Sequence, residues 1–249
     1  MKHDLIIRNG KLVTANETYT ADIGIKDGRI ATLGENLDGN DIINADKKLV
    51  MPGGIEAHCH IAQESANGIM TSDDYETGSI SAAFGGNSCF VPFAAQKKGE
   101  SIASTIAEYD RRAETKSVID YSYHLILTDP NENVLNELPS AFERGITSFK
   151  VFMTYATRVS DAQFLDILTI ARRHGGLTMV HAENHDMLSW MSNALTQAGY
   201  TEPRYHAPAR PSLAEEEAIN RAISLSKLAN APLMIVHVST PKGAELVAQ

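Results

Sequence analysis

The pattern of hydrophobic and polar positions along the chain changes near residue 54. Residues 3–50 consist of short apolar runs separated by glycine turns. The pairs Asn9-Gly10 and Asp27-Gly28 each lie between two apolar runs, a pattern typical of β-hairpins. We therefore predict a small β-sandwich module over residues 1–52, built from a few antiparallel strands.

After residue 54, apolar runs rich in β-branched residues alternate with helical stretches. The segment 160–176 has apolar residues at helical spacing and ends in two glycines, so it predicts an amphipathic helix. Its expected buried face consists of Phe164, Ile167, Leu168 and Ala171. The segment 213–230 has the same character. Six apolar runs are predicted as strands, over residues 54–60, 87–95, 120–127, 147–155, 177–183 and 231–239. Such alternation predicts a parallel sheet covered by helices.

The arrangement of strands and helices favours a barrel over a dinucleotide-binding sheet. No G-x-G-x-x-G motif follows any of the predicted strands. A TIM-type (β/α)8 barrel needs eight strands. This chain has six and ends in the helical stretch after the sixth. We therefore expect an α/β fold with an incomplete (β/α)8 barrel over residues 53–249.

Composition narrows the possible partners. The 249 residues are 43% hydrophobic and 21% charged, which is ordinary for a globular protein. With a net charge of −9 and no run of Lys or Arg, a nucleic-acid partner is not expected. The apolar runs are far shorter than the roughly 20 residues that span a bilayer, so no membrane partner is expected. Cys59 and Cys89 lack CxxC spacing, and we interpret them as reduced residues of a cytoplasmic protein.

Residues that can hold a metal fall near the ends of predicted strands. His58 and His60 lie two apart, so on a strand they face the same way. This pair alone is equally compatible with core histidines. His181 and His237 end two further strands, and Lys150 lies inside another, flanked by apolar residues. Because lysine is almost never buried unpaired, the whole set favours a metal site.

Lys150 determines which kind of metal site is expected. A cationic ammonium would be repelled by a metal ion. After reaction with CO2, however, the side chain becomes a carbamate whose two oxygens can bridge two metals. Histidine and oxygen ligands suit Zn2+ best, with Mn2+, Fe2+ or Ni2+ as alternatives. A bridged pair of divalent ions predicts two-metal hydrolysis.

Several motifs, in order along the chain, resemble one branch of the cyclic amidohydrolases. They are "PGGIEAHCH", "SFKVFMTY", "VHAEN" and the segment 210–239, which begins "RPSLAEEEAINRA". Over its whole length the chain resembles the dihydropyrimidinases and D-hydantoinases. The resemblance implies a binuclear site, and its implied ligands are His58, His60, N6-carboxylated Lys150, His181 and His237. It also implies that Tyr155 binds the substrate carbonyl and its developing oxyanion, and that the full-length protein is a homotetramer with a composite β-sandwich.

The implied reaction is hydrolytic opening of a small cyclic amide or ureide, such as a dihydropyrimidine or a 5-substituted hydantoin, in pyrimidine degradation. We expect Ile69, Met70 and Phe93 to shape the pocket for an apolar ring substituent. Allantoinase and dihydroorotase are the nearest enzymatic alternatives, since they share the metal chemistry. A non-catalytic assembly homologue is a further alternative. Those homologues lack the metal ligands, whereas all five expected here are present.

The chain also departs from the family pattern. The family's last ligand, an aspartate that carries protons, ends the eighth strand and lies outside this sequence, so the chain is expected to be C-terminally truncated and inactive alone. His185 stands where relatives usually have glycine, and we predict a loop residue near the rim, not a ligand. His124 is predicted to be buried and hydrogen-bonded. His3, His174 and His206 are predicted to be solvated, and the acidic segment 72–78 predicts a helix start.

Overall fold

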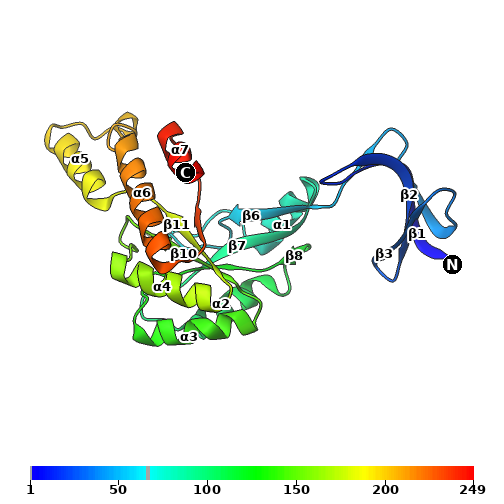
Figure 1. Ribbon diagram of the computed structural model, residues 1–249, viewed down its shortest axis with the longest axis horizontal. Coiled ribbons are helices and arrows are strands. Elements are labelled where there is room, and N and C mark those ends of the chain that lie inside the picture. Colours follow the sequence, from blue (N-terminus) through cyan, green and yellow to red (C-terminus); the bar gives the residue numbers. More distant parts are fainter. Residues whose placement is uncertain (1, 66–67) are drawn as a thin grey trace. The chain divides into compact units, whose positions relative to one another are not determined.

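The computed structural model describes residues 2–65 and 68–249 and divides the chain into two compact units, Met1–Gly54 and Ile55–Gln249 (Figure 1). No helix in these described ranges is long and apolar enough to cross a membrane.

The first unit is a five-stranded sheet with the order β3-β2-β1-β4, in which β5 also pairs with β1. The strands are β1 (His3–Val13), β2 (Thr18–Lys26), β3 (Arg29–Gly34), β4 (Gly39–Asn44) and β5 (Leu49–Val50). Strands β1, β2 and β3 are antiparallel neighbours, but β4 and β5 run parallel to β1. The prediction of antiparallel strands is therefore wrong for β4 and β5. The backbone of His3 donates to Asp38 O (3.1 Å), so β4 begins beside the start of β1 and runs with it.

Only one of the two predicted hairpins forms. Asp27 and Gly28 have φ values of 52° and 71° and connect β2 to β3, as predicted. Asn9 and Gly10 instead lie inside β1, where the register with β2 shifts at a bulge. The backbone N–H of Asn9, whose φ is 62°, donates to Oδ1 of buried Asp22 (2.9 Å), and this tertiary contact replaces the turn.

His3 is buried, contrary to the prediction that it is solvated. It is 3% exposed, and its ring nitrogens lie 3.0 Å from Asp38 O and 3.0 Å from Thr32 Oγ1. A Cβ on Gly24 would come within 2.5 Å of the ring, so the glycine makes room for it. His174 and His206 are exposed, as predicted.

The second unit is a curled parallel sheet with the order β12-β11-β10-β9-β7-β6, and β8 pairs with β7 (Figure 1). Its strands are β6 (Gly54–Cys59), β7 (Asn87–Ala95), β8 (Asp120–Tyr121), β9 (His124–Ile126), β10 (Ser148–Phe152), β11 (Leu177–His181) and β12 (Leu233–Ile235). The six predicted strands are confirmed. The third is interrupted, but both pieces keep one register against β7, with Cys89 opposite Asp120 and Phe93 opposite His124. The sheet is half of a barrel.

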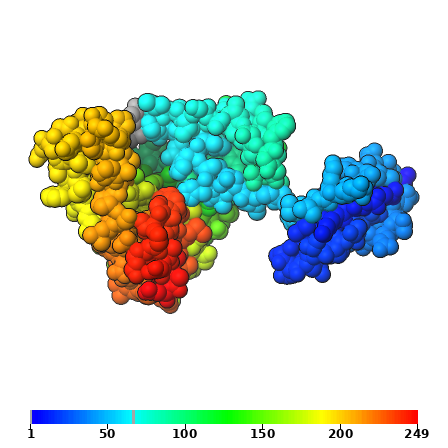
Figure 2. All heavy atoms as spheres, turned by 90° about the horizontal axis from the view of Figure 1, so that it is seen from above, coloured from blue at the N-terminus to red at the C-terminus, as the bar shows by residue number. Residues whose placement is uncertain are grey.

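Helices connect these strands. They are α1 (Tyr75–Phe84), α2 (Ile102–Ala113), α3 (Glu132–Glu143), α4 (Asp161–Arg173), α5 (His185–Gln197), η1 (Pro203–Tyr205), α6 (Ser212–Ala229) and α7 (Pro241–Ala248). The acidic segment 72–78 does begin a helix, because Asp74 caps α1. Ser160 and Gln163 form a capping box on α4, and Gly175 follows this helix with a φ of 74°. Figure 2 shows α7 (red) lying against α6 (orange).

The two faces of the parallel sheet have different surroundings. The predicted apolar face of α4 is buried in the large core between sheet and helices, together with Phe149 and Val151 of β10. The alternate residues Lys150 and Phe152 face the concave side. There, the buried apolar cluster is small and consists of Phe93, Ile126, Met179 and Val236. The concave face therefore leaves room for polar side chains at the strand ends.

Candidate active site

The carboxyl ends of the strands bring the predicted site residues together. His58 lies in β6, His60 follows that strand, His181 ends β11, and His237 follows β12. The ring centroids of His58 and His60 are 5.8 Å apart, those of His58 and His237 5.6 Å, and those of His181 and His237 4.7 Å. Three separate strands thus place imidazoles side by side at one end of the sheet.

Only 1% of the surface of Lys150 is exposed, and the residue lies close enough to His58, His60 and His237 for its charge to act on them. Its Nζ lies 4.9 Å from the ring centroid of Phe93 and 5.2 Å from that of Phe152. Within residues 2–65 and 68–249, no carboxylate oxygen lies within 4.0 Å of this nitrogen. Burial lowers the pKa of Lys150 to about 8, so roughly a tenth of the amine is uncharged at pH 7, far more than at its usual pKa.

The imidazoles of His58, His60 and His237 are neutral at physiological pH. Loss of solvent, together with the positive charge of Lys150, lowers the pKa of His58 to about 4. The pKa values of His60 and His237 are also lowered, mainly by loss of solvent. A neutral imidazole keeps a lone pair on one nitrogen, which is the form that binds metals.

The donor set fits a zinc-like ion in chemistry and in one pairwise distance. Nδ1 of His181 and Nε2 of His237 are 3.1 Å apart. Two nitrogens bound to one tetrahedral zinc ion, each at about 2.0–2.1 Å, are about 3.3–3.4 Å apart. In the described part of the chain, however, no three His, Cys, Asp or Glu side chains are gathered as a complete metal centre. A third ligand would therefore have to reach the metal by a change of side-chain conformation near His181 and His237.

Two of the candidate site residues have strained backbones. Tyr155, just after β10, has a φ of 70°, and His237 has a φ of 39°. For residues other than glycine such left-handed conformations cost on the order of 1–3 kcal/mol and are concentrated at functional sites. The ring of Tyr155 lies 5.1 Å from that of His181 and 5.9 Å from that of Phe152. Backbone strain therefore marks the same end of the sheet, independently of residue type.

The sequence did not reveal an ion pair at this site. Oε2 of Glu183 lies 2.6 Å from Nε2 of His181 and 2.5 Å from a guanidinium nitrogen of Arg210. The guanidinium carbon lies 5.4 Å from the ring centroid of Tyr155. Burial raises the pKa of Glu183, but its bonds to His181 and Arg210 outweigh this effect and hold the pKa at about 2. The i, i+2 spacing of His181 and Glu183 was a usable signal, whereas nothing local indicated Arg210.

The remaining predicted residues take varied places. Phe93 is fully buried and stacks on His60, with centroids 4.7 Å apart, so it supports that ring from below. Ile69 and Met70 are exposed, at 69% and 48%. His124 is hydrogen-bonded through both ring nitrogens, as predicted, but it is half-buried and not fully buried. His185 is the first residue of α5 and not a loop residue, because Asn184 caps this helix immediately before it.

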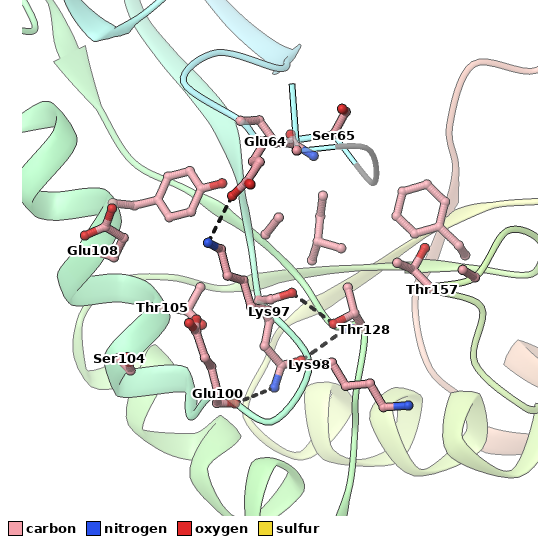
Figure 3. A pocket seen from close by; sticks show the side chains of 18 of the residues that line it. Glu64, Ser65, Lys97, Lys98, Glu100, Ser104, Thr105, Glu108, Thr128 and Thr157 are labelled. Atoms are coloured by element: carbon pink, nitrogen blue, oxygen red, sulfur yellow. Dashed lines mark hydrogen bonds and ion pairs between the residues drawn. The ribbon is translucent and has the colours of Figure 1, made fainter. Parts of the chain in front are cut away.

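A cavity of about 970 Å³ opens beside Tyr155, at the ends of β7, β9 and β10 (Figure 3). Lys97 and Glu64 form an ion pair of 3.0 Å on its wall. The side chain of Gln96 accepts from the backbone of Thr128 (3.1 Å) and donates to Glu100 O (2.8 Å), which fixes the neighbouring loops. The cavity is large enough for a small cyclic molecule with a substituent.

The curled sheet with histidines and a buried lysine at its strand ends defines an amidohydrolase-type half-barrel. Comparison with known proteins narrows this class. A D-hydantoinase of Geobacillus stearothermophilus is 42% identical over 249 residues, covering 98% of this chain and 53% of that protein. A dihydropyrimidinase of Rattus norvegicus is 34% identical over 254 residues, covering 98% of this chain and 49% of that protein. The crystal structure of dihydropyrimidinase from Brevibacillus agri has a TM-score of 0.94 at 42% identity, covering 100% of this chain and 54% of that one.

By both sequence and fold, over nearly its whole length, the chain is similar to D-hydantoinases and dihydropyrimidinases, as the resemblance of its motifs predicted. It spans about half the length of the curated relatives it matches. No family model matches the chain.

Proposed function

We propose that the chain forms the metal-binding half of a cyclic amidohydrolase that opens the C–N bond of dihydropyrimidines or 5-substituted hydantoins. The observation that carries this proposal is buried Lys150, which lies without a described carboxylate partner and near enough to His58, His60 and His237 for its charge to act on them. The names of the relatives, D-hydantoinase and dihydropyrimidinase, support this substrate class. The alternatives allantoinase and dihydroorotase are not favoured.

Five residues would hold the metal ions. They are His58, His60, His181, His237 and Lys150, the last as an N6-carboxylysine formed with CO2. Zn2+ is the preferred ion, because neutral imidazoles and a carbamate oxygen are its usual kinds of ligand. Bound divalent ions would supply Lewis acidity at the substrate carbonyl. The presence of all five positions argues against a non-catalytic assembly homologue.

The chain's own side chains would orient the substrate and stabilise charge. Tyr155 would donate its hydroxyl proton in a hydrogen bond to the substrate carbonyl oxygen, a bond that strengthens as negative charge develops there. The adjacent cavity would hold the substituent of the ring. Phe93 would keep His60 in place by stacking on it. We also propose that the full-length protein is a cytoplasmic homotetramer.

Metal and carbamate binding can be tested without turnover. The chain is loaded with zinc and 13C-labelled bicarbonate, and its zinc content and carbamate carbon signal are measured. We expect at least one zinc ion per chain and one carbamate signal, both lost in Lys150→Ala. Lys97→Ala, which removes an exposed lysine paired with Glu64, is the matched control and should retain both. A wild-type chain with less than one zinc ion would contradict the proposal.

The substrate class needs an activity assay on the longest product of the gene. Dihydrouracil and hydantoins are offered beside allantoin and dihydroorotate. We expect hydrolysis of the first two, its loss in Lys150→Ala, and partial rescue of this variant by a small added carboxylic acid. Lys150→Arg should not be rescued, because a guanidinium stays cationic and cannot take up CO2. Turnover of only allantoin or dihydroorotate would overturn the assignment.

A further inference from the structure

We propose that Arg210 is a positioning residue that holds His181 and Tyr155 as one unit, through Glu183 on one side and through the tyrosine ring on the other. This inference rests on the proposed function, because it takes His181 as a metal ligand and Tyr155 as the residue that binds the substrate carbonyl. Arg210 itself is not assigned a contact with the substrate.

The first half of the argument concerns the tautomer of His181. Oε2 of Glu183 lies 2.6 Å from Nε2 of His181, and an ionised carboxylate can only accept hydrogen bonds. Nε2 must therefore carry the proton, and the lone pair of a neutral ring lies on Nδ1. That atom is the one that lies 3.1 Å from Nε2 of His237. Glu183 thus directs the metal-binding nitrogen of His181 toward the second histidine, the arrangement in which an outer carboxylate orients a ligand.

The second half concerns what holds Glu183. Its side chain is 17% exposed and that of Arg210 is 27% exposed, so the ion pair is largely shielded from solvent. The same carboxylate oxygen is 2.5 Å from a guanidinium nitrogen of Arg210. Without the arginine, a mostly buried carboxylate would lose its countercharge and would gain by turning toward water. His181 would then lose the partner that fixes its ring.

The third contact extends this unit to Tyr155. The guanidinium carbon of Arg210 lies 5.4 Å from the ring centroid of Tyr155, within the range of about 6 Å for a cation–π contact. The ring of His181 lies 5.1 Å from the same tyrosine. Because Tyr155 is 40% exposed on a strained backbone, with a φ of 70°, these ring contacts decide where its hydroxyl points.

Arginine is suited to this double role, and lysine is not. The planar guanidinium can donate along its edge to Glu183 while its face stacks on an aromatic ring. The ammonium of a lysine would keep the charge, but it could neither donate two parallel hydrogen bonds to the carboxylate nor stack a planar face on the ring. Arg210 reaches the site from the segment between η1 and α6, so it joins a third part of the chain to the ends of β10 and β11.

The experiment reads the tyrosine environment in metal-free protein. The chain is labelled with 3-fluorotyrosine, and Tyr155→Phe assigns the fluorine resonance of Tyr155. We expect Arg210→Gln to shift this resonance and to leave that of Tyr205 in place. The matched control is Arg204→Gln, because Arg204 lies over the ring of Tyr205 at 5.0 Å and pairs with Glu202 at 3.5 Å. Arg204→Gln should shift the resonance of Tyr205 and leave that of Tyr155 in place.

A second reading measures zinc affinity by competition with a chelator. We expect Arg210→Gln and Glu183→Gln each to weaken zinc binding about tenfold or more, in the range seen when outer partners of ligands are removed. Glu202→Gln should leave the affinity unchanged. If Arg210→Gln does not fold, Arg210→Lys replaces it, with the same expected shift of the Tyr155 resonance.

The two proposals fail in different ways. If the wild-type chain binds no zinc, the proposed function fails, and the fluorine measurement still tests the contacts of Arg210. If the Arg210 variant keeps the Tyr155 resonance and a zinc affinity within twofold of wild type, the positioning role is overturned.

Discussion

Neighbouring residues of β10 point to opposite faces of the same sheet and meet opposite surroundings. Phe149 and Val151 enter the large apolar core beneath the helices. Lys150, between them, faces two aromatic rings on the concave side and lies near His58, His60 and His237. The helix-facing side is apolar and closely packed, whereas the concave side holds a buried amine and ends in strained residues. This difference indicates that the helix-facing side supplies most of the stability, and that the concave side gives up stability to gather reactive groups.

The largest expected effect comes from removing an aromatic ring on the helix-facing side. Phe149 is fully buried and packs against Phe142, with centroids 5.4 Å apart. Phe149→Ala should lower the free energy of unfolding by about 3–5 kcal/mol, measured by urea denaturation. Phe152→Ala, on the concave face of the same strand, is the matched control. Its ring is only half-buried, so we expect a clearly smaller loss, and equal losses would break the comparison.

The second prediction is that a substitution on the concave side raises the free energy of unfolding instead of lowering it. Burial lowers the pKa of Lys150 from 10.5 to about 8, so the charged amine destabilises the metal-free fold. Lys150→Met should therefore stabilise chelator-treated protein at pH 7, by on the order of 3 kcal/mol at most.

The pH dependence gives the control for this prediction. Below pH 8 both the folded and the unfolded wild-type chains bind the proton, and the cost of burying the charge is fully present. Between about pH 8 and 10.4 the unfolded chain binds more protons, so wild-type stability rises relative to the variant. The advantage of Lys150→Met should shrink across this range. An advantage that is constant with pH would contradict the electrostatic cause.

The alternation along β10 could be predicted from the sequence, because side chains on a strand change faces at every residue. The spacing of His58 and His60 was informative for the same reason. Local patterns could not distinguish Asn9-Gly10 from a hairpin, since the deciding contact is the distant acceptor Asp22. Arg210 was missed because its partner Glu183 is 27 residues away, and no periodicity joins them. Sequence thus predicts which residues share a face, but not which distant loop reaches them.

A smaller effect is expected at the start of α4, which packs on the helix-facing side. Oγ of Ser160 accepts from the backbone of Gln163 at 3.2 Å, and the side chain of Gln163 accepts from the backbone of Ser160 at 2.9 Å. Ser160→Ala should cost about 1 kcal/mol of unfolding free energy. Ser224→Ala in α6 is the control, since that hydroxyl donates only to Asn220 O within its own helix. Ser224→Ala should not show the loss of unfolding free energy that we expect for Ser160→Ala.

The smallest effect should come from the ion pair of Glu64 and Lys97, at the concave side's rim. The pair measures 3.0 Å, but the two side chains are 38% and 58% exposed. Water and salt screen such charges, and ordering two long side chains opposes the attraction, so exposed pairs add little stability. Glu64→Gln should leave the urea midpoint within experimental error, with the shift of Ser160→Ala measured alongside to show that a small loss is detectable. The prediction would be wrong if Glu64→Gln lost as much stability as Ser160→Ala and if added salt reduced that loss. Charges at the rim would then stabilise the fold, and the difference in stability between the two faces would be smaller.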